Sequence, residues 1–410
     1  MGRLETRAVD KRMRFVTEVE RGEESFAAVC RRHSYSRRTG YKWWARYHSE
    51  GLDGLSDRSR APHEHPQAVN PEVAARCLAV RQAHPTWGPV KVREWLDRRF
   101  PAVAWPAVST IGVLFDRAGL TVKRKVRRRA TPSSAPFGAC RGANDVWCMD
   151  FKGWFLTGDG THCEPFTLSD AHSRYLLRCQ ALNRNDTAHV WPVLDAAFRE
   201  FGLPLRLRSD NGSPFASTGA GCLSRLAVKV IKAGVEPERI VPGKPQQNGR
   251  LERLHLTLLQ DTASPPARSL REQLDRFHEF QQVYNEERPH AALGNATPAD
   301  HYAPSRRRWD GVLREPEYPA QCAVRRVRPN GAIRWQDAEI YLTQALVGEP
   351  IGLRECEDGS STVHYGPLLL GMIAHRGSRL RKPTAARRGL VDNPDGFSTI
   401  PPPQPPQSES

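Results

Sequence analysis

Three acidic residues in this sequence occupy positions where a carboxylate could do chemistry. Asp150 lies inside an apolar, strand-like run, and Asp210 follows residues 205–208, which alternate apolar and basic, and precedes a turn. Glu252 lies in a segment whose leucines recur three and four residues apart, as on one face of a helix. Three hard oxygen ligands that a fold brings together suit Mg²⁺ or Mn²⁺. Metal-assisted chemistry is therefore the first hypothesis for this chain.

The position of Glu252 on its predicted helix is open to two interpretations. It follows Leu251 by one residue, about 100° further round the helix, which places it at the edge of the apolar face. A carboxylate at that edge can point into a cleft while the leucines anchor the helix. The simpler interpretation is an amphipathic helix with a solvated glutamate, because most helical glutamates are no more than that. The two strand-associated aspartates favour a site.

Length and charge bound the class of protein. The chain has 410 residues, enough for two to four domains, and a hydrophobic share of 39% suffices for packed cores. The net charge of +16 and the pI near 9.8 indicate a polyanionic partner. Nucleic acid is the first such partner, and a membrane surface is the rival.

Targeting and cysteine patterns point to the cytoplasm. No apolar run approaches the length of a bilayer span, and the first residues lack the apolar stretch of a secretory signal. Nine cysteines without regular spacing argue against a disulfide framework, and the lack of paired CxxC motifs argues against a zinc knuckle. We expect reduced, structural cysteines in a cytoplasmic protein.

Residues 1–57 have the pattern of three helices joined by short turns. The turn His33-Ser34-Tyr35 precedes the third helix, which Ser36 is placed to cap. This is a helix-turn-helix layout, whose last helix meets base edges through its N-terminal end. The exposed residues expected there are Arg37, Arg38, Tyr41 and Lys42. A plain three-helix bundle with a basic face is the alternative, but the clustering favours DNA binding.

A second helical unit, residues 67–122, leads into a basic segment, residues 123–141. Three further helices are expected in the unit, which is either a second helix-turn-helix domain or a packing module between domains. The basic segment is either a solvated linker or an arm that follows DNA phosphates, and its place between a DNA-reading unit and the acidic residues favours the arm. Its basic residues include Arg124, Lys125, Arg127 and Arg128.

Residues 142–302 contain all three carboxylates, and strands precede mixed strands and helices there. This order predicts an α/β layer. The expected elements are a strand with Asp150, strand residues 165–178, a helix at 187–201, a strand at 205–208, a helix at 224–233 and a short strand at 240–241 before the Glu252 helix. Beyond them, short alternating runs around turns at 318–383 predict a small β-barrel, and the Pro-rich tail 384–410 is expected to be disordered.

Taken together, these segments resemble the catalytic core of retroviral integrases, and most closely that of bacterial insertion-sequence transposases. Asp150, then Ser209-Asp210-Asn211-Gly212, then residues 243–249 leading to Glu252 follow the order of that core's two aspartates and glutamate. Residues 284–298 resemble the segment that ends such cores. The resemblance spans roughly residues 12–302. The interval from Asp210 to Glu252 is longer than in retroviral integrases, and we expect the extra residues in the loop 214–223.

The resemblance implies a multidomain fold and a chemistry. The fold has N-terminal all-α helix-turn-helix units, a central α/β RNase H-like integrase core and a small C-terminal β-barrel. Asp150, Asp210 and Glu252 would be both the catalytic residues and the ligands of Mg²⁺ or Mn²⁺, two ions in all. Such ions clamp the attacking and leaving oxygens of a phosphodiester. The residues that would position the DNA backbone are Lys244, Asn248, Arg250 and Arg253.

The function implied is that of a transposase, which binds the ends of a mobile element and catalyses DNA cleavage and strand transfer. Its partners would be double-stranded DNA, from element ends and target, and further copies of the chain, since two ends must be joined in concert. No membrane is implied, and the protein would be associated with the nucleoid. Two alternatives stay open: a DNA-binding regulator without catalysis, and an RNase H-like nuclease without strand transfer.

Overall fold

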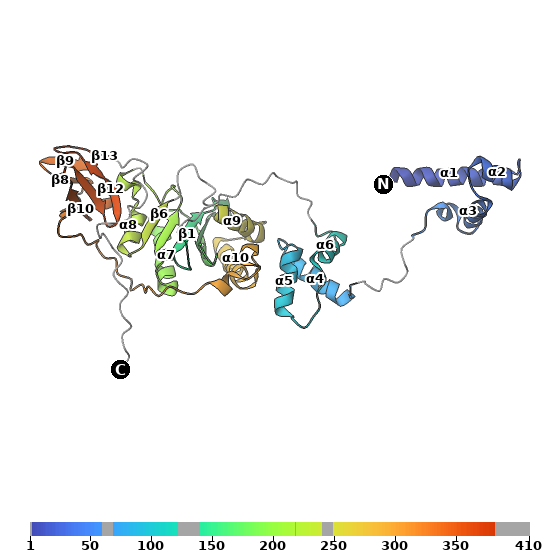
Figure 1. Cartoon of the computed structure of the whole chain (residues 1–410), viewed down its shortest axis with the longest axis horizontal. Coiled ribbons are helices and arrows are strands. Elements are labelled where there is room, and N and C mark those ends of the chain that lie inside the picture. Colours follow the sequence, from blue (N-terminus) through green and yellow to red (C-terminus); the bar gives the residue numbers. More distant parts are fainter. Residues whose placement is uncertain (1, 60–68, 122–139, 218, 240–248, 382–410) are drawn as a thin grey trace. The chain divides into compact units, whose positions relative to one another are not determined.

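The computed structural model describes residues 2–59, 69–121, 140–217, 219–239 and 249–381 (Figure 1). The chain divides into two compact units, residues 1–69 and residues 70–410, which are described separately below. No helix in the described part of the chain is long and apolar enough to cross a membrane.

The first unit consists of α1 (Gly2–Arg21), α2 (Phe26–Arg32), α3 (Arg37–Glu50) and a 3₁₀ turn, Gly51–Leu55. The Ser36 side chain accepts a hydrogen bond from the Thr39 amide, which confirms the predicted cap of the third helix. Ser34 has a φ of 57°, the left-handed conformation that reverses the chain between α2 and α3. At Gly40 a Cβ atom would lie 2.5 Å from the Cys30 sulfur, so glycine lets the two helices approach closely. The predicted layout is confirmed.

The second unit begins with α4 (Pro71–Ala83), α5 (Pro89–Arg99) and α6 (Val108–Arg117). Prolines at the first turns of α4 and α5 fit positions where the backbone N–H has no helical partner. The three helices enclose a small core that includes Trp87, Leu96 and Ile111. The helices expected from the sequence are therefore present.

A central sheet follows, with strands in the order β2-β3-β1-β5-β6 and β4 paired to β3. Strands β1 and β3 are antiparallel, as are β3 and β4, whereas β1, β5 and β6 run parallel. Their bounds are β1 (Val146–Phe151), β2 (Phe155–Leu156), β3 (His162–Asp170), β4 (Leu176–Leu182), β5 (Arg206–Ser209) and β6 (Glu236–Arg239).

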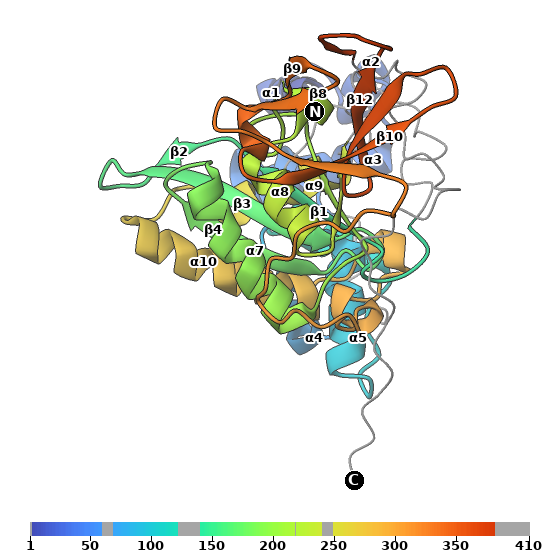
Figure 2. The ribbon, with the colours of Figure 1, turned by 90° about the vertical axis from the view of Figure 1, so that its left-hand side faces the viewer.

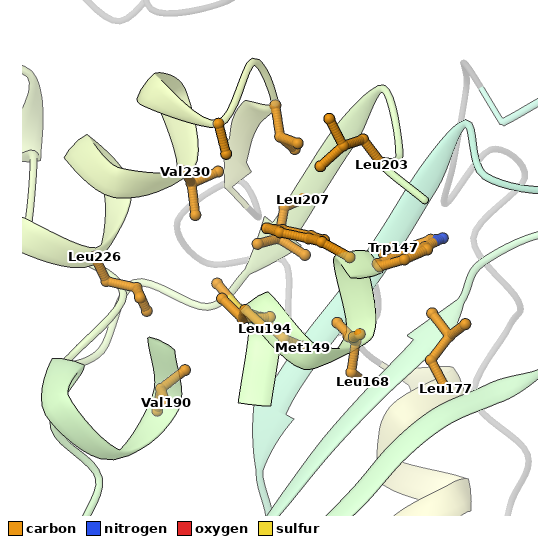
Figure 3. Packing of buried hydrophobic residues seen from close by; sticks show 14 of the residues in the cluster. Trp147, Met149, Leu168, Leu177, Val190, Leu194, Leu203, Leu207, Leu226 and Val230 are labelled. Atoms are coloured by element: carbon orange, nitrogen blue, oxygen red, sulfur yellow. The ribbon is translucent and has the colours of Figure 1, made fainter. Parts of the chain in front are cut away.

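Helices cover both faces of this sheet, and β1 lies between them in Figure 1. Helices α7 (Thr187–Phe201) and α8 (Arg225–Lys232) pack on the face that includes Trp147 and Met149 (Figure 3). Helices α9 (Gly249–Thr262) and α10 (Leu270–Gln282) pack on the face that includes Val146 and Cys148. The strand period of two sends neighbouring β1 residues to opposite cores, as a sheet buried on both faces requires.

One predicted strand, residues 240–241, lies outside the described residues. The last core strand among the described residues is β6, Glu236–Arg239, directly before it. The sequence of β6, Glu-Pro-Glu-Arg, contains no apolar alternation. Among the described strands β6 pairs only with β5, so it can carry a proline and charged side chains at the edge of the sheet.

The segment after α10 ties the helices back to the sheet. It contains a π-helical turn (Val283–Glu287) and two 3₁₀ turns, Ala291–Leu293 and Pro298–His301. The Asn285 side chain accepts from the Leu176 amide and donates to the Leu176 carbonyl, at 2.8 and 2.9 Å. Arg288 reaches Asp261 of α9 at 3.6 Å. This motif, which resembles the end of integrase cores, is thus a structural clamp.

Helix α5 of the second helical unit contacts the same clamp. The Trp95 indole donates to the Glu287 carboxylate at 3.1 Å, and Arg98 forms an ion pair with Asp300 at 2.6 Å. Thr86, just before α5, donates to Asp261 at 3.3 Å. The unit therefore packs against the core through α5.

The C-terminal region forms two separate sheets. Strands β13-β12-β11-β10-β7 form one, and the hairpin β8-β9 forms the other. The bounds are β7 (Ala323–Arg326), β8 (Ala332–Trp335), β9 (Ala338–Tyr341), β10 (Pro350–Glu355), β11 (Ser361–Tyr365), β12 (Leu368–Ile373) and β13 (Leu380–Arg381). The predicted closed barrel is not confirmed, because β13 and β7 remain unjoined edges within the described strands.

This β region is not an independent module either. Its apolar side chains form one core with Ala227, Val228 and Ile231 of α8, and both views show its strands beside that helix (Figure 2). The opposite side of α8, with Leu226 and Val230, packs into the core of the central sheet. The loop after Asp210 also contacts the β region, because Gly219 lies against Thr343. The β region therefore braces the segment that follows Asp210.

Candidate active site

The sheet brings the two aspartates together. The parallel register pairs Val146 with Arg206 and Cys148 with Arg208, an offset of 60 residues, which is also the separation of Asp150 and Asp210. The paired residues end two positions before Asp150 and Asp210; carried onward, the same offset would set the two backbones about 5 Å apart, near the carboxyl ends of adjacent strands. Carboxyl ends of parallel strands are where such folds place ligands.

Local backbone contacts orient each aspartate. One oxygen of Asp150 accepts from the Phe151 amide at 2.9 Å, and its side chain is 13% exposed. Asp210 follows β5, where the strand ends, and accepts from the Gly212 amide at 3.0 Å. A Cβ atom at Gly212 would lie 3.1 Å from the Asp210 carboxylate, so this position favours glycine.

Glu252 lies on the first turn of α9, as the leucine pattern predicts. Leu251, Leu254 and Leu258 are buried against the sheet, while Glu252 and Arg253 are exposed. A carboxylate near the N-terminus of a helix is favoured by the helix dipole. The glutamate thus keeps an accessible side chain on a helix whose opposite face is anchored.

His255 connects this helix to Asp150, and the sequence analysis missed it. The ring is 2% exposed, its Nε2 lies 2.7 Å from the Thr167 hydroxyl, and its Nδ1 lies 4.0 Å from an Asp150 carboxylate oxygen. Burial, helped by the charge of Lys152, lowers the pKa of His255 to about 4. The one available signal was a polar residue one turn beyond Glu252 and inside the leucine stripe.

Asp150 lies near the end of β1, Asp210 just after β5, and α9, which carries Glu252, approaches Asp150 through His255, but in the described structure the three carboxylates do not form one coordination sphere. Within the described residues, no group of three His, Cys, Asp or Glu side chains is placed so that it could hold a metal ion. The donor chemistry nevertheless fits: Asp150 and Asp210 carry hard carboxylate oxygens near the ends of neighbouring strands, and Glu252 lies about 5 Å along α9 from His255. These residues suit a divalent ion of the Mg²⁺ type.

Two other acids of the core have structural roles. Asp170 is buried and accepts hydrogen bonds from the Asn144 amide and from both the amide and the hydroxyl of Ser173. Asp159 accepts from the Thr157 hydroxyl within a turn, and this hydrogen bond lowers the pKa of Asp159. Both oxygens of Asp170 and one oxygen of the exposed Asp159 therefore hold local backbone turns in place.

The DNA-contact candidates fall into two groups. In the first unit, Arg37, Arg38, Tyr41 and Lys42 are all exposed on α3, and the Tyr41 ring stacks on Phe26 with centroids 4.1 Å apart. In the core, Arg253 is exposed beside Glu252. The remaining candidates lie outside the described residues: Arg124, Lys125, Arg127, Arg128, Lys244 and Asn248. The side chain of Arg250 is also outside the described part of the chain.

Family models match most of this architecture. Residues 11–63 match a helix-turn-helix domain and residues 39–114 a homeodomain-like domain. Two integrase core domain models match residues 141–245 and 233–298, and together they include all three carboxylates.

Two curated proteins of insertion elements are similar in sequence. A 39.2 kDa protein of insertion element IS476 from Xanthomonas euvesicatoria is 26% identical over 250 residues, covering 60% of this chain and 69% of that protein. A 31.7 kDa protein of insertion element IS407 from Burkholderia multivorans is 28% identical over 201 residues, covering 47% of this chain and 68% of that protein.

Solved structures of retroviral integrases are also similar, but distantly. The catalytic core domain of HTLV-2 integrase with magnesium is 14% identical at a TM-score of 0.31, covering 40% of this chain and 99% of that one. The integrase chain in a simian T-cell lymphotropic virus intasome is 14% identical at a TM-score of 0.35, covering 70% and 91%. TM-scores this low carry no weight, so the domain-model and sequence matches are the informative comparisons.

Proposed function

We propose that this chain, an insertion-sequence transposase with helix-turn-helix domains ahead of an integrase-like core, uses Asp150, Asp210 and Glu252 to cleave and join DNA strands. The observation that supports the proposal is the parallel register of β1 and β5, whose last pair, Cys148 with Arg208, lies two residues before Asp150 and Asp210 at the same offset. Helix α9, which carries Glu252, contacts Asp150 through His255 at the same edge. The three residues are therefore the proposed catalytic and metal-binding set.

The residues would divide the work as follows. The three carboxylates would hold two divalent ions, Mg²⁺ or Mn²⁺, which when bound stabilise the attacking and leaving oxygens of an in-line phosphodiester displacement. Arg253 would hold the DNA backbone beside Glu252, because phosphate contacts set position rather than sequence. Tyr175 and Tyr302 stack on one another inside the core, which suits a structural role and a mechanism without a covalent tyrosine intermediate.

Recognition of the element ends would belong to the first helical unit, residues 1–57. Arg37 and Arg38 lie at the N-terminal end of α3 with exposed side chains, the position from which such helices read base edges. Replacing Arg37 or Arg38 by alanine should cost about 1–3 kcal/mol of end binding and relax preference at one base. Equal losses on specific and random DNA would reassign that residue to a phosphate contact.

The remaining segments would extend the grip on DNA and allow assembly. In this proposal residues 67–122 form a second DNA-binding domain, 123–141 a basic arm, 142–302 the catalytic core, 318–383 the bracing β region and 384–410 a tail. Each chain supplies one set of carboxylates, whereas two element ends must be joined to a target. We therefore expect at least a dimer on DNA in the cytoplasm.

Complementation tests the assembly. A chain with Asp210→Asn and a chain with both Arg37→Ala and Arg38→Ala should each lack strand transfer. Mixed together, they should regain part of it if one subunit binds an end that another subunit cuts. A mixture as inactive as its components, with a single-chain mass on DNA, would contradict the assembly.

Cleavage assays test the catalytic assignment. Asp150→Asn, Asp210→Asn and Glu252→Gln should each lower Mg²⁺-dependent cleavage of element-end DNA at least about a thousandfold, because metal ions supply several kcal/mol of transition-state stabilisation. End binding should stay near that of the parent. Asp275→Asn, at an exposed aspartate on α10, is the matched control and should cleave normally. A triad variant that cleaves like the control would remove its residue from the set. Cleavage without strand transfer by the parent would instead indicate a nuclease.

A further inference from the structure

The clearest buried polar contact that the proposed chemistry does not use belongs to His255. Its side chain is almost fully buried between α9 and the central sheet, among the apolar residues Leu254 and Leu258. A histidine in that place is often no more than a core residue with a satisfied hydrogen bond. Here its partners are specific, and they lie on the strands that carry or adjoin the proposed ligand Asp150.

The register of the sheet determines which residue contacts the His255 ring. Nε2 of His255 lies 2.7 Å from the hydroxyl of Thr167, which is completely buried on β3. Thr167 is the residue paired with Asp150 across the antiparallel β1·β3 ladder, and its hydroxyl donates to the Asp150 carbonyl at 3.4 Å. The imidazole is thus joined through one hydroxyl to the backbone of the proposed ligand.

The ring also faces the ligand's carboxylate directly. Nδ1 of His255 lies 4.0 Å from an Asp150 oxygen, beyond a direct hydrogen bond but close enough to limit where the carboxylate turns. The other oxygen is held by the Phe151 amide. Asp150 is therefore enclosed by β1 on one side and by a residue of α9 on the other.

The same histidine lies one helical turn from Glu252. The two residues are three apart on α9, one turn of helix, so a shift of the ring moves the glutamate with it. Among the described side chains of α9, Leu251, Leu254 and Leu258 pack in one core with residues of the sheet, and these contacts are apolar, hence non-directional. The hydrogen bond from His255 to Thr167 supplies a direction that these leucines cannot.

We infer that His255 is a positioning residue that fixes the spacing between Asp150 and Glu252, and hence the affinity of the proposed site for its divalent ions. The inference rests on the proposed function of the three carboxylates. Residues that orient metal ligands through a second layer of contacts typically change metal affinity by about 10–100-fold when replaced.

The test separates positioning from packing with two variants at one site. His255→Leu keeps an apolar core of similar size but removes both ring nitrogens, whereas His255→Gln can place an amide near the position of Nε2. We expect His255→Leu to weaken Mn²⁺ binding to the full chain about tenfold or more, measured by electron paramagnetic resonance. We expect His255→Gln to recover most of that loss.

A second route removes the partner. Thr167→Val is nearly isosteric and deletes only the hydroxyl, so it should weaken Mn²⁺ binding by a factor like that of His255→Leu. Because both changes break the same link, the double variant should bind Mn²⁺ about as well as either single one. Multiplied effects in the double variant would show that the two residues act separately and would overturn the inference.

Thermal unfolding and the triad variants keep the outcomes distinct. If His255→Leu unfolds at a lower temperature but its folded fraction binds Mn²⁺ like the parent, the residue is only a core histidine and the inference fails. If Asp150→Asn also binds Mn²⁺ like the parent, the proposed set of carboxylates fails as well. Loss in Asp150→Asn together with parent-like binding in His255→Leu would overturn the inference alone.

Discussion

The β1–β5 strand pair and helix α9 contribute to the same site by different physical means. The two aspartates lie at or just after the ends of neighbouring strands, whose backbone hydrogen bonds begin a few residues earlier in the chain. Glu252 lies on a helix whose place depends on side chains: three leucines and the contact of His255 with Thr167. Two of the proposed ligands are therefore positioned by strands and one by side-chain packing, which makes the third the more sensitive to change.

The largest expected effect comes from loosening the helix. Leu258→Ala removes a completely buried side chain of α9 and should destabilise the protein by about 2–5 kcal/mol. Leu168→Ala is the matched control, since it removes an equally buried leucine from β3 on the opposite face of the sheet. Chemical denaturation should show similar losses for both variants.

The two leucine variants should differ in the metal dependence of cleavage. After correction for the folded fraction, Leu258→Ala should need several times more Mn²⁺ for half-maximal cleavage, whereas Leu168→Ala should match the parent. Equal metal requirements in the two variants would mean that packing of α9 does not govern the site.

A smaller effect is expected on the strand side. Gly212→Ala brings a methyl group to about the 3.1 Å at which a Cβ would meet the Asp210 carboxylate, so that side chain must turn. We expect cleavage to fall about tenfold with a loss of no more than about 1–3 kcal/mol in the free energy of unfolding. Gly142→Ala, in the same domain with open space around its Cβ position, should change neither quantity. Cleavage at the parent's rate by Gly212→Ala would show that Asp210 tolerates displacement.

The smallest expected effect is on the pH dependence of stability, through the helical unit that packs against the clamp. Lys91 of α5 is largely buried there. Burial, together with the nearby charge of Arg288, lowers the pKa of Lys91 to about 8 from its usual 10.5. Between about pH 8 and 10.5 the unfolded chain therefore binds a proton that the folded chain does not, so this lysine adds stability as the pH rises through that window. Below pH 8 both states are protonated and its contribution is constant.

Lys91→Met isolates this contribution, because other groups also titrate at high pH. The difference in melting temperature between Lys91→Met and the parent should favour the variant at pH 7.5 and shrink toward pH 10.5. A difference that does not change with pH would place Lys91 in solvent rather than against the core.

Much of this fold follows from local sequence. The four-residue spacing of Val190, Leu194 and Phe198 predicts the helix 187–201, and the alternation before Asp210 predicts β5. Ser36 and Ser224 both cap helices because their hydroxyls accept from amides three residues on. Each of these patterns is complete within a few neighbouring residues.

What the sequence could not predict depends on residues far apart in the chain. His255 becomes significant only when the β1·β3 register sets Thr167 opposite Asp150, a pairing that no local pattern encodes. Likewise, the apolar face that α8 shares with the C-terminal strands is formed by two segments about a hundred residues apart. A barrel was expected from alternating runs alone, and alternation does not determine whether a sheet closes.

The most direct test of the account is a Mn²⁺ titration of the full chain, followed by electron paramagnetic resonance. Asp150→Asn, Asp210→Asn and Glu252→Gln should each lower the affinity at least tenfold, while Asp275→Asn should bind like the parent. Glu252 is decisive, because it lies on an exposed turn of α9 and only joint coordination would link it to the two strand ends. If Glu252→Gln bound Mn²⁺ as tightly as the parent, the three carboxylates would not form one site, and the account would be contradicted.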